Sequence, residues 1–320
     1  MKKMKAVLCK KYGKPNVLRW AEVNKPIPKA DEALVKIYAT AVTASDCLLR
    51  GLNVPGAHYF PIKQLMKFGM RVFIGFKRPR NPILGLVFSG VIEDNNTNSN
   101  FNIGDEVFGF TGVSRATYAE YKCISAKEME SGEVALKPKN ASHQEATAIV
   151  YGGVLALYFM RNANIKIGQK VLIYGASGAN GIAAIQIAKH HGATVTAVCS
   201  QKNFELVKSI GADQVIDYTN KKAVNKLEKY NFILDAVGKN KTSPLKIACK
   251  HRLTLNGRYA SVDDGFLKIK PSYLLKLTTY FETGNFKAVI DKSFSLKNIK
   301  AAHEYVEKGH KRGNVIINVV

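Results

Sequence analysis

The residues with the clearest chemical capability are three glycines spaced three apart, Gly175, Gly178 and Gly181. They follow a short apolar stretch, Val171–Tyr174, and precede an uninterrupted helical pattern. Glycines at such a turn let the backbone approach a pyrophosphate, while the new helix directs free N–H groups and its positive dipole end at the phosphates. We therefore expect a dinucleotide site whose loop residues are Gly175, Ser177, Gly178, Ala179, Asn180 and Gly181.

Two other interpretations of this run remain open. The strict G-x-G-x-x-G pattern needs glycine at position 176, where Ala176 stands, so the run also fits a plain strand-to-helix turn. A hydrolase elbow of the form G-x-S-x-G fits less well, because its last position is Ala179.

The choice of coenzyme depends on the end of the next expected strand, 194–199. A carboxylate at this place would bind the ribose hydroxyls of NAD, but no acid occurs before Glu205. Ser200 and Lys202 can instead bind and neutralise a 2′-phosphate, although a lysine in so basic a chain can also be simply solvated. The missing acid favours NADPH.

Two kinds of element must position these residues. Residues 5–120 are rich in strand patterns separated by turn residues, whereas strands and helices alternate from residue 170 onward. A capping box at Ser142 and Glu145 precedes a helical pattern at about 152–163. Alternation predicts an α/β fold with a doubly wound parallel sheet. Its strands are expected at 171–174, 194–199, 214–217, 231–236 and 257–262, and its helices at 179–191 and near 203–210, 220–228 and 243–250.

Composition sets the broad class. A chain of 320 residues with 46% hydrophobic residues suits two domains with separate cores. Its five cysteines are dispersed without a C-x-x-C pair, which indicates reduced thiols, and no segment approaches the length of a membrane span. We therefore expect a cytoplasmic protein. The net charge of +24 favours anionic partners such as phosphorylated cofactors, nucleic acid or anionic lipid, unless the lysines are merely solvated.

One basic and apolar segment, 60–80, contains no acid. It fits a helix on a membrane surface that admits lipophilic substrates. It also fits a solvated face over the wall of a substrate pocket, which is the interpretation we favour from the sequence.

Several further runs, in this order and spacing, resemble the medium-chain dehydrogenase/reductase superfamily, in its zinc-free, NADPH-dependent quinone-oxidoreductase-like branch. Besides the glycine run they are Met4–Val7, Ile103–Gly109, Ser209–Tyr218, Leu234–Gly238 and Ala302–Val315. The resemblance implies a GroES-like β-barrel domain from residues 1–135 and about 290–320. It implies a Rossmann domain at 136–289, with the active site in the cleft between the two.

The resemblance also implies site residues and a metal-free site. Thr43 would face the nicotinamide, and further coenzyme contacts would come from Tyr218, Asp235, Val237, Gly238, Gly313 and Asn314. Zinc-dependent relatives carry Cys-His-Ser-Asp where this chain has Thr43–Asp46, and Gly-His-Glu where it has Gly85–Val87. The four-cysteine structural lobe is missing as well. We therefore expect no metal.

Hydride addition to a quinone or an α,β-unsaturated carbonyl suits a site without a metal, because the enolate can be stabilised by hydrogen bonds and then protonated. Tyr59 and Tyr151 are the candidate proton donors and Asp46 is a weaker one, each with a structural role as the alternative. The first hypothesis is thus an NADPH-dependent quinone or enone reductase. The second is an NADPH-binding sensor or nucleic-acid-binding protein with little turnover.

Two departures from the family pattern bear on these hypotheses. The segment 263–271 is too short for the usual helix and sixth, dimer-forming strand, so the oligomeric state stays open. Leu155 stands where relatives often have a threonine near the coenzyme.

Overall fold

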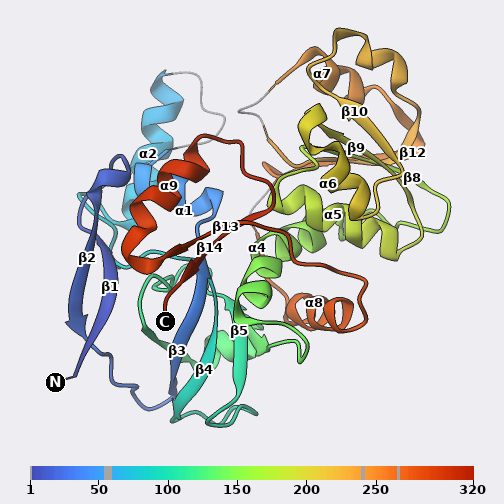
Figure 1. Ribbon diagram of the computed structural model, residues 1–320. Coiled ribbons are helices and arrows are strands. Elements are labelled where there is room, and N and C mark those ends of the chain that lie inside the picture. The colour runs from blue at the N-terminus through green and yellow to red at the C-terminus, as the bar shows by residue number, and fades with distance from the viewer. Residues whose placement is uncertain (1, 54–59, 239–241, 265–266) are drawn as a thin grey trace. The chain divides into compact units, whose positions relative to one another are not determined.

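The computed structural model describes residues 2–53, 60–238, 242–264 and 267–320, and its chain forms two compact units (Figure 1). Unit 1 comprises Met1–Tyr151, Ile269–Glu282 and Ile290–Val320. Unit 2 comprises Gly152–Lys268 and Thr283–Val289. The sequence had suggested grouping 136–151 and 269–282 with the nucleotide-binding part, whereas their contacts join them to unit 1.

The described part of unit 2 contains five strands in one parallel sheet of order β10-β9-β8-β11-β12. Val171, Leu172 and Ile173 in the central strand are fully buried, as a strand covered on both faces requires. This confirms the doubly wound parallel sheet expected from the alternation. The strands are β8 (Lys170–Tyr174), β9 (Thr194–Cys199), β10 (Gln214–Asp217), β11 (Tyr230–Asp235) and β12 (Leu253–Ser261).

Short helical segments connect these strands. Helix α5 (Ala179–His190) is buried from Ala179 to Ala188, so it lies in the interior of unit 2. The helix expected near 220–228 is instead a 3₁₀ segment, η3 (Lys221–Lys226), because Asn220 accepts a hydrogen bond from the Lys222 N–H and Leu227 returns to extended backbone. The others are η2 (Gln201–Asn203), α6 (Phe204–Ser209) and α7 (Pro244–Lys250).

The strands of unit 1 form a β-hairpin and a larger sheet. β1 (Lys3–Cys9) and β2 (Leu18–Asn24) pair antiparallel. In the described residues the larger sheet has the order β13-β14-β3-β4-β5-β7, and β6 pairs with β3. The last strand of the chain lies beside β3, so the C-terminal segment completes the first domain, as the family resemblance implies. The bounds are β3 (Glu32–Ala41), β4 (Val87–Asn95), β5 (Glu106–Phe110), β6 (Tyr121–Ser125), β7 (Val134–Leu136), β13 (Ile290–Ser295) and β14 (Asn314–Asn318).

Unit 1 also contains helical segments. They are η1 (Pro15–Val17), α1 (Ala44–Gly51), α2 (Phe60–Ile74), α3 (Ala126–Glu130), α8 (Pro271–Glu282), η4 (Leu296–Asn298) and α9 (Ile299–Glu307). α4 (His143–Met160) starts in unit 1 and ends in unit 2. The expected capping box starts α4, because Glu145 accepts from the Ser142 N–H at 2.9 Å and donates its own N–H to the Ser142 hydroxyl. That box therefore begins one long helix rather than a separate short turn before residue 152.

The chain leaves β12 without a sixth strand in the part that is described. Residues 267–270 are irregular and lead into α8, whose Thr278 hydroxyl donates to the carbonyl of Leu136 at the end of β7. Within the short segment 263–271, residues 265–266 lie outside the described residues. Among the described helices, none combines the length and the apolar composition needed to cross a bilayer.

Candidate functional site

The glycine turn joins β8 to α5 in the way the sequence predicts. The Gly175 and Ala176 N–H groups both donate to the Val198 carbonyl, at 2.9 and 3.1 Å, which holds the turn against β9. Gly178 is the N-cap of α5 and offers no side chain to satisfy the first-turn N–H groups. Such an uncapped helix start is a ready site for an anion.

Two of the glycines are required by the turn itself. Gly175 has φ +83°, and an added Cβ would lie 2.4 Å from the Val237 side chain. A Cβ at Gly181 would lie 2.4 Å from the Gly175 carbonyl oxygen. At Gly178, in contrast, a Cβ would meet protein only at 3.6 Å, which is ordinary contact. The absence of a side chain at Gly178 therefore has no cause within the fold and fits close approach by a ligand.

Buried polar atoms near this turn lack partners in the described part of the chain. Asn180, at 7% exposure, has neither its amide nitrogen nor its oxygen hydrogen-bonded. Because a buried unpaired amide is costly, this pair of atoms fits hydrogen bonds to a polar ligand. The unpaired Asn180 amide thus supports binding of dinucleotide phosphates at this turn, and this observation is independent of the glycine pattern.

A second buried amide was not identified from the sequence. Asn203 donates to the hydroxyls of Ser177, at 3.0 Å, and Ser200, at 3.2 Å, so it ties the glycine turn to the end of β9. Its side-chain oxygen is buried without a partner in the described residues. A polar residue three positions after Ser200 was the available signal, but its burial was not readable from the sequence.

The remaining residues assigned to the adenosine end of the coenzyme lie at the carboxyl ends of β9 and β10. Lys202 is exposed in η2, beside the half-buried Ser200. Tyr218 follows β10, is 44% exposed, and tilts its ring at a centroid distance of 6.4 Å from that of Tyr174. These three side chains are accessible to a ligand.

Asp235 ends β11, and both oxygens of its carboxylate accept hydrogen bonds from other groups of the protein. One oxygen accepts the N–H groups of Val237 and Gly238, at 3.1 and 3.2 Å. The other accepts the Tyr259 hydroxyl at 3.1 Å and the Lys246 ammonium at 2.7 Å. Asp235 therefore shapes the 236–238 turn, which packs on Gly175 through Val237, and its lone pairs are largely occupied.

The candidates in unit 1 form a separate group. Thr43 is the N-cap of α1, and its N–H and hydroxyl both donate to one Asp46 carboxylate oxygen, at 2.9 and 2.6 Å. Burial raises the pKa of Asp46 to about 6. This capping box gives Asp46 a structural function in starting α1 and leaves the Thr43 hydroxyl proton occupied.

The surroundings of Tyr151 suit a proton donor. Its hydroxyl lies 2.7 Å from the Ser45 hydroxyl, and its ring stacks on Phe110 at a centroid distance of 6.2 Å. Desolvation raises the pKa of the Tyr151 phenol, which stays protonated at neutral pH. Ser45 was not singled out in the sequence, because its partner lies 106 positions away. Tyr59 lies outside the described residues.

Gly313 and Asn314 stand at the start of β14 in unit 1. Gly313 has φ +73°, so the glycine is needed for the turn before the strand. Asn314 is opposite Ile290 in the β13–β14 register. Their proposed contact with the coenzyme stays a prediction.

No group of three or more His, Cys, Asp or Glu side chains is placed to hold a metal ion within the described ranges. The expected ligand positions carry Thr43 and Leu86, both buried, which supply no zinc ligand of the usual kind. That the site holds no metal remains a prediction, which direct metal analysis of the purified protein can test.

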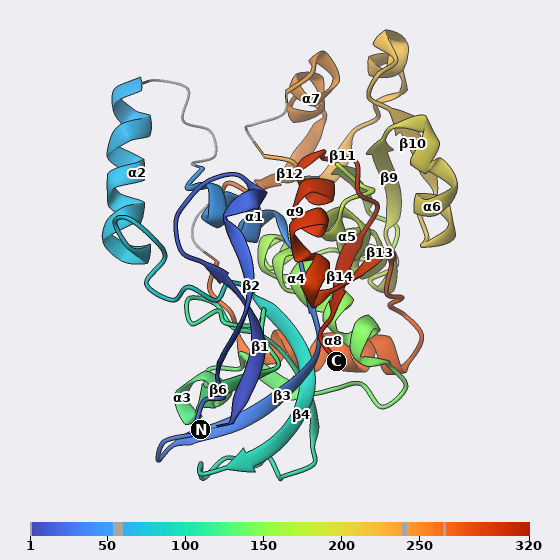
Figure 2. The same cartoon turned by 60° about the vertical axis from the view of Figure 1, so that its left-hand side comes forward.

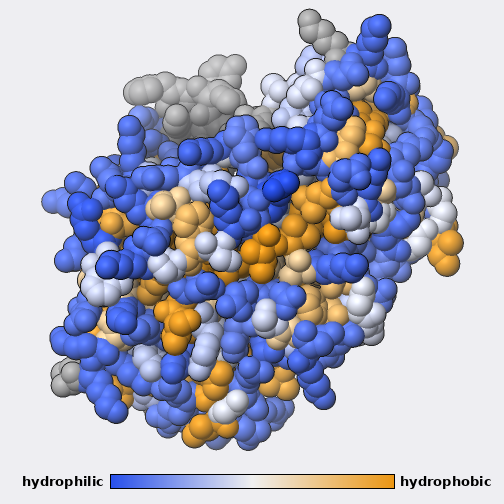
Figure 3. All heavy atoms as spheres, viewed as in Figure 1, coloured by the Kyte–Doolittle hydropathy of each residue, from blue (hydrophilic) through white to orange (hydrophobic). Residues whose placement is uncertain are grey.

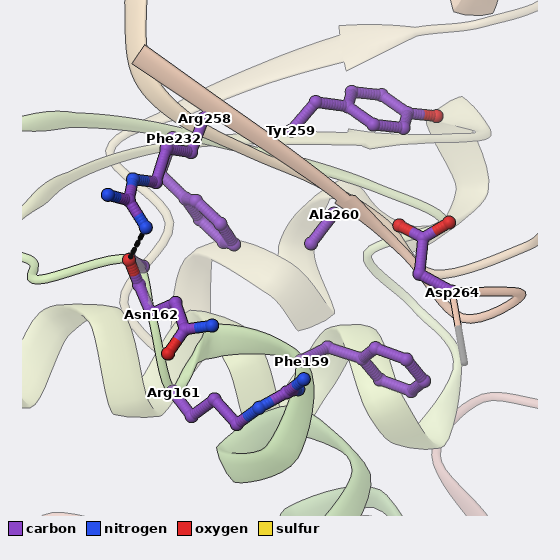
Figure 4. A pocket seen from close by; sticks show the side chains of 9 residues that line it. Phe159, Arg161, Asn162, Phe232, Arg258, Tyr259, Ala260 and Asp264 are labelled. Carbon is purple, nitrogen blue, oxygen red and sulfur yellow. Dashed lines mark hydrogen bonds between the residues drawn. The ribbon is translucent and has the colours of Figure 1, made fainter. Parts of the chain in front are cut away.

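A cavity of about 320 Å³ in unit 2 is lined by none of the site residues expected from the sequence, although Tyr259, the partner of Asp235, lines it (Figure 4). Side chains from β11, β12 and the end of α4 surround it, and Arg258 donates to the Asn162 carbonyl at 3.1 Å. It lies beside β12, which has no further strand next to it in the described residues.

The parallel sheet, the glycine turn and the unsatisfied Asn180 amide define a dinucleotide-binding protein with a second, strand-rich unit. Models of the zinc-binding dehydrogenase family match residues 179–262 and 252–317. The chain is 30% identical to "NAD(P)H oxidoreductase RTN4IP1, mitochondrial" of Bos taurus, over 99% of this chain and 89% of that protein. It is also 30% identical to "2-methylene-furan-3-one reductase" of Solanum lycopersicum, over 99% and 79%.

Among solved structures, the quinone oxidoreductase from Coxiella burnetii superimposes with a TM-score of 0.79 at 25% identity, over the whole of both chains. The chain belongs to the medium-chain dehydrogenase/reductase superfamily, in its quinone oxidoreductase-like branch. This confirms both the family resemblance and the expected fold class of a GroES-like unit with a Rossmann unit.

The same comparison contradicts the cytoplasmic prediction. RTN4IP1 proteins of mouse, human and cattle are named as mitochondrial. The prediction failed because dispersed cysteines report only a reducing environment, which does not identify the organelle.

Proposed function

We propose that this protein is an NADPH-dependent oxidoreductase that transfers a hydride to a quinone or an α,β-unsaturated carbonyl compound. Three relatives are named for such chemistry: an NAD(P)H oxidoreductase, a 2-methylene-furan-3-one reductase and a quinone oxidoreductase. The observation that carries the proposal is the buried, unpartnered amide of Asn180 beside the uncapped start of α5. The substrate is a small molecule.

The coenzyme would be held by unit 2. The first-turn N–H groups of α5 and the Asn180 amide would bind the pyrophosphate. Ser177, Ser200, Asn203 and Lys202 would bind the adenosine end, and Tyr218 would pack beside it. The turn formed by Ala236, Val237 and Gly238, which Asp235 holds in place, would support the ribose of the nicotinamide.

NADPH is preferred over NADH in this proposal, because the end of β9 offers a hydroxyl and an ammonium rather than a carboxylate. Glu205, the first acid after β9, has its side chain 92% exposed and pairs with Lys208 at 3.6 Å. That ion pair gives Glu205 a partner on its own helix.

The reaction requires a proton as well as a hydride. When bound, NADPH supplies the hydride from C4 of its nicotinamide ring. The phenol of Tyr151 is protonated at neutral pH, since burial raises a pKa that is already well above 7. The Ser45 hydroxyl lies 2.7 Å away and can orient it. We therefore propose Tyr151 as the proton donor, with Tyr59 as the other candidate; Asp46 is assigned to capping α1 and positioning Thr43. The residues present give no reason to invoke a metal.

Two measurements test this function. NADPH oxidation is followed at a fixed coenzyme concentration with a panel of quinones, enones and aldehydes, and NADH is compared at the same concentrations. We expect turnover with quinones or enones and tighter binding of NADPH. Tight NADPH binding without oxidation of any acceptor would instead support the sensor hypothesis, and a salt-sensitive shift of RNA would extend it to nucleic acid.

A single methyl group tests the coenzyme site. Gly178→Ala adds a Cβ that meets no protein atom closer than 3.6 Å, so we expect unchanged folding and a Kd for NADPH at least about ten-fold higher. Gly69→Ala is the matched control, because its Cβ would project into open space in α2. Unchanged NADPH affinity in Gly178→Ala would refute close contact between this backbone and the pyrophosphate.

A further inference from the structure

Helix α2 exposes a concentration of large apolar side chains to solvent. Hydrophilic residues cover most of the face shown in Figure 3. Of the 17 exposed large apolar side chains in the described residues, six lie between Leu65 and Phe76. In Figures 1 and 2 the helix stands at the outer side of unit 1, apart from its strands. Between 41% and 80% of the surface is exposed at Leu65, Met66, Phe68, Val72, Phe73 and Phe76.

The five of these side chains that belong to α2 lie on one side of the helix, and Phe76 follows its C-terminal end. At 100° per residue, Leu65, Phe68 and Val72 form one stripe and Phe73 lies next to it. At the same spacing Lys67 lies on the other side of the helix, and Arg71 lies at the edge of the stripe, about 60° from Phe68. The helix is therefore amphipathic, with its apolar side turned to solvent.

The C-terminal end of the helix contacts the body of unit 1. Ile74 is buried, and the Tyr12 hydroxyl donates to the Gly75 carbonyl at 2.7 Å. The rings of Phe68 and Phe76 contact each other edge to face at a centroid distance of 5.8 Å, yet both remain more than half exposed. The aromatic pair thus forms a surface feature rather than part of the core.

The charge around this surface has one sign. No aspartate or glutamate occurs between Asp46 and Glu93, and the basic residues of the helix and the segment after it are Lys63, Lys67, Arg71, Lys77, Arg78 and Arg80. The side chains of Arg71, Lys77, Arg78 and Arg80 are exposed. A partner for this surface must therefore accept apolar side chains and carry negative charge.

A second copy of the chain does not satisfy this requirement, because apposing two such surfaces would bring like charges together. Nucleic acid would match the charge, but it offers no apolar surface to the aliphatic side chains Leu65, Met66 and Val72. We propose that α2 and the segment 75–80 dock the protein on the surface of an anionic phospholipid bilayer. The apolar side chains enter the headgroup boundary, and the lysines and arginines pair with lipid phosphates. This binding is separate from the reductase activity.

The test uses the full chain and sedimentation with unilamellar vesicles. Vesicles of phosphatidylcholine are compared with vesicles containing about one third phosphatidylglycerol, at ~50 mM and ~500 mM salt. We expect at least ten-fold stronger binding to the anionic vesicles at low salt, and a marked loss at high salt. Absence of binding to anionic vesicles at low salt would overturn the proposal.

Variants separate this helix from the general positive charge. Phe68→Ser with Phe73→Ser, and Lys77→Gln with Arg78→Gln, are each expected to weaken vesicle binding at least ten-fold. The controls are Leu255→Ser, at a fully exposed leucine of unit 2, and Lys166→Gln with Lys297→Gln. We expect the controls to bind within two-fold of the parent protein.

Three other outcomes would also refute the proposal. One is an equal loss of vesicle binding in the controls. Another is dimerisation in light scattering that disappears in the double phenylalanine variant while vesicles do not bind. The third is salt-sensitive RNA binding that depends on Lys77 and Arg78 but not on the phenylalanines. Unchanged thermal unfolding of each variant shows that the fold is kept.

Discussion

The ion pair between Lys246 and Asp235 offers the sharpest test of how the coenzyme turn is held. The two charged atoms lie 2.7 Å apart, with only 7% and 4% of the side chains exposed. Lys246→Met keeps the aliphatic stem and removes the charge. The Asp235 carboxylate is then buried without its cation, although it still accepts the N–H groups of Val237 and Gly238 and the Tyr259 hydroxyl.

Breaking a buried pair from one side destabilises a protein by about 3–5 kcal/mol. Because the hydrogen bonds that remain on Asp235 offset part of this loss, we expect about 3 kcal/mol for Lys246→Met. At about 2.1 cal/mol/K of unfolding entropy per residue, a chain of 320 residues then unfolds at a temperature lower by roughly 4–5 °C. The double variant with Asp235→Asn removes the isolated charge and is expected to recover at least half of this loss.

The assay is thermal unfolding followed by circular dichroism, together with NADPH titration. Lys189→Met is the matched control, because its pair with Asp213 is at a similar 2.9 Å but is about one third exposed. We expect it to lose less than about 1 kcal/mol. A midpoint for Lys246→Met within about 2 °C of the parent protein, or an equal loss in the control, would refute the reasoning.

Three further predictions concern unit 1 and the metal. Burial raises the pKa of Asp46 from 3.8 to about 6. The contribution of protonated Asp46 to the stability of the folded protein is therefore complete below pH ~3.8 and is lost as the pH rises through 6. Between pH ~4 and ~7 the free energy of unfolding should therefore fall by up to ~3 kcal/mol relative to Asp46→Asn; parallel urea-denaturation profiles would contradict this. Tyr151→Phe should lower kcat at least about ten-fold with little change in the Kd for NADPH, whereas Tyr12→Phe should keep the kcat; an unchanged kcat in Tyr151→Phe would remove its role as donor. Dialysis against a chelator should leave turnover unchanged, and stoichiometric zinc in the washed protein would show the metal-free prediction to be wrong.

The turn that binds the coenzyme was readable from the sequence because its signals are local. The spacing of Gly175, Gly178 and Gly181 and the strand before them lie within eleven consecutive residues. The alternation of strands and helices has the same character, and it predicted the parallel sheet. Only η3 differed in type, since a side-chain cap at Asn220 decided the local hydrogen bonding.

Contacts between distant residues were not readable in this way. Asn203 links Ser177 and Ser200, and Ser45 meets Tyr151, through folding rather than spacing. Asp235 was expected to contact the coenzyme, but its lone pairs are largely occupied by the turn it shapes and by Lys246. Residue type suggests what a side chain can do, whereas its neighbours determine which of these capabilities is already used.

The amino-acid sequence by itself determined the family, the fold class and the coenzyme turn, because periodicity and glycine spacing act over short distances along the chain. The tertiary structure alone decided which polar groups are left without partners and which apolar side chains remain in water. Both depend on burial, and burial is a property of segments that meet only after folding. The unpartnered amide of Asn180 and the exposed stripe of α2 are therefore findings of the structure.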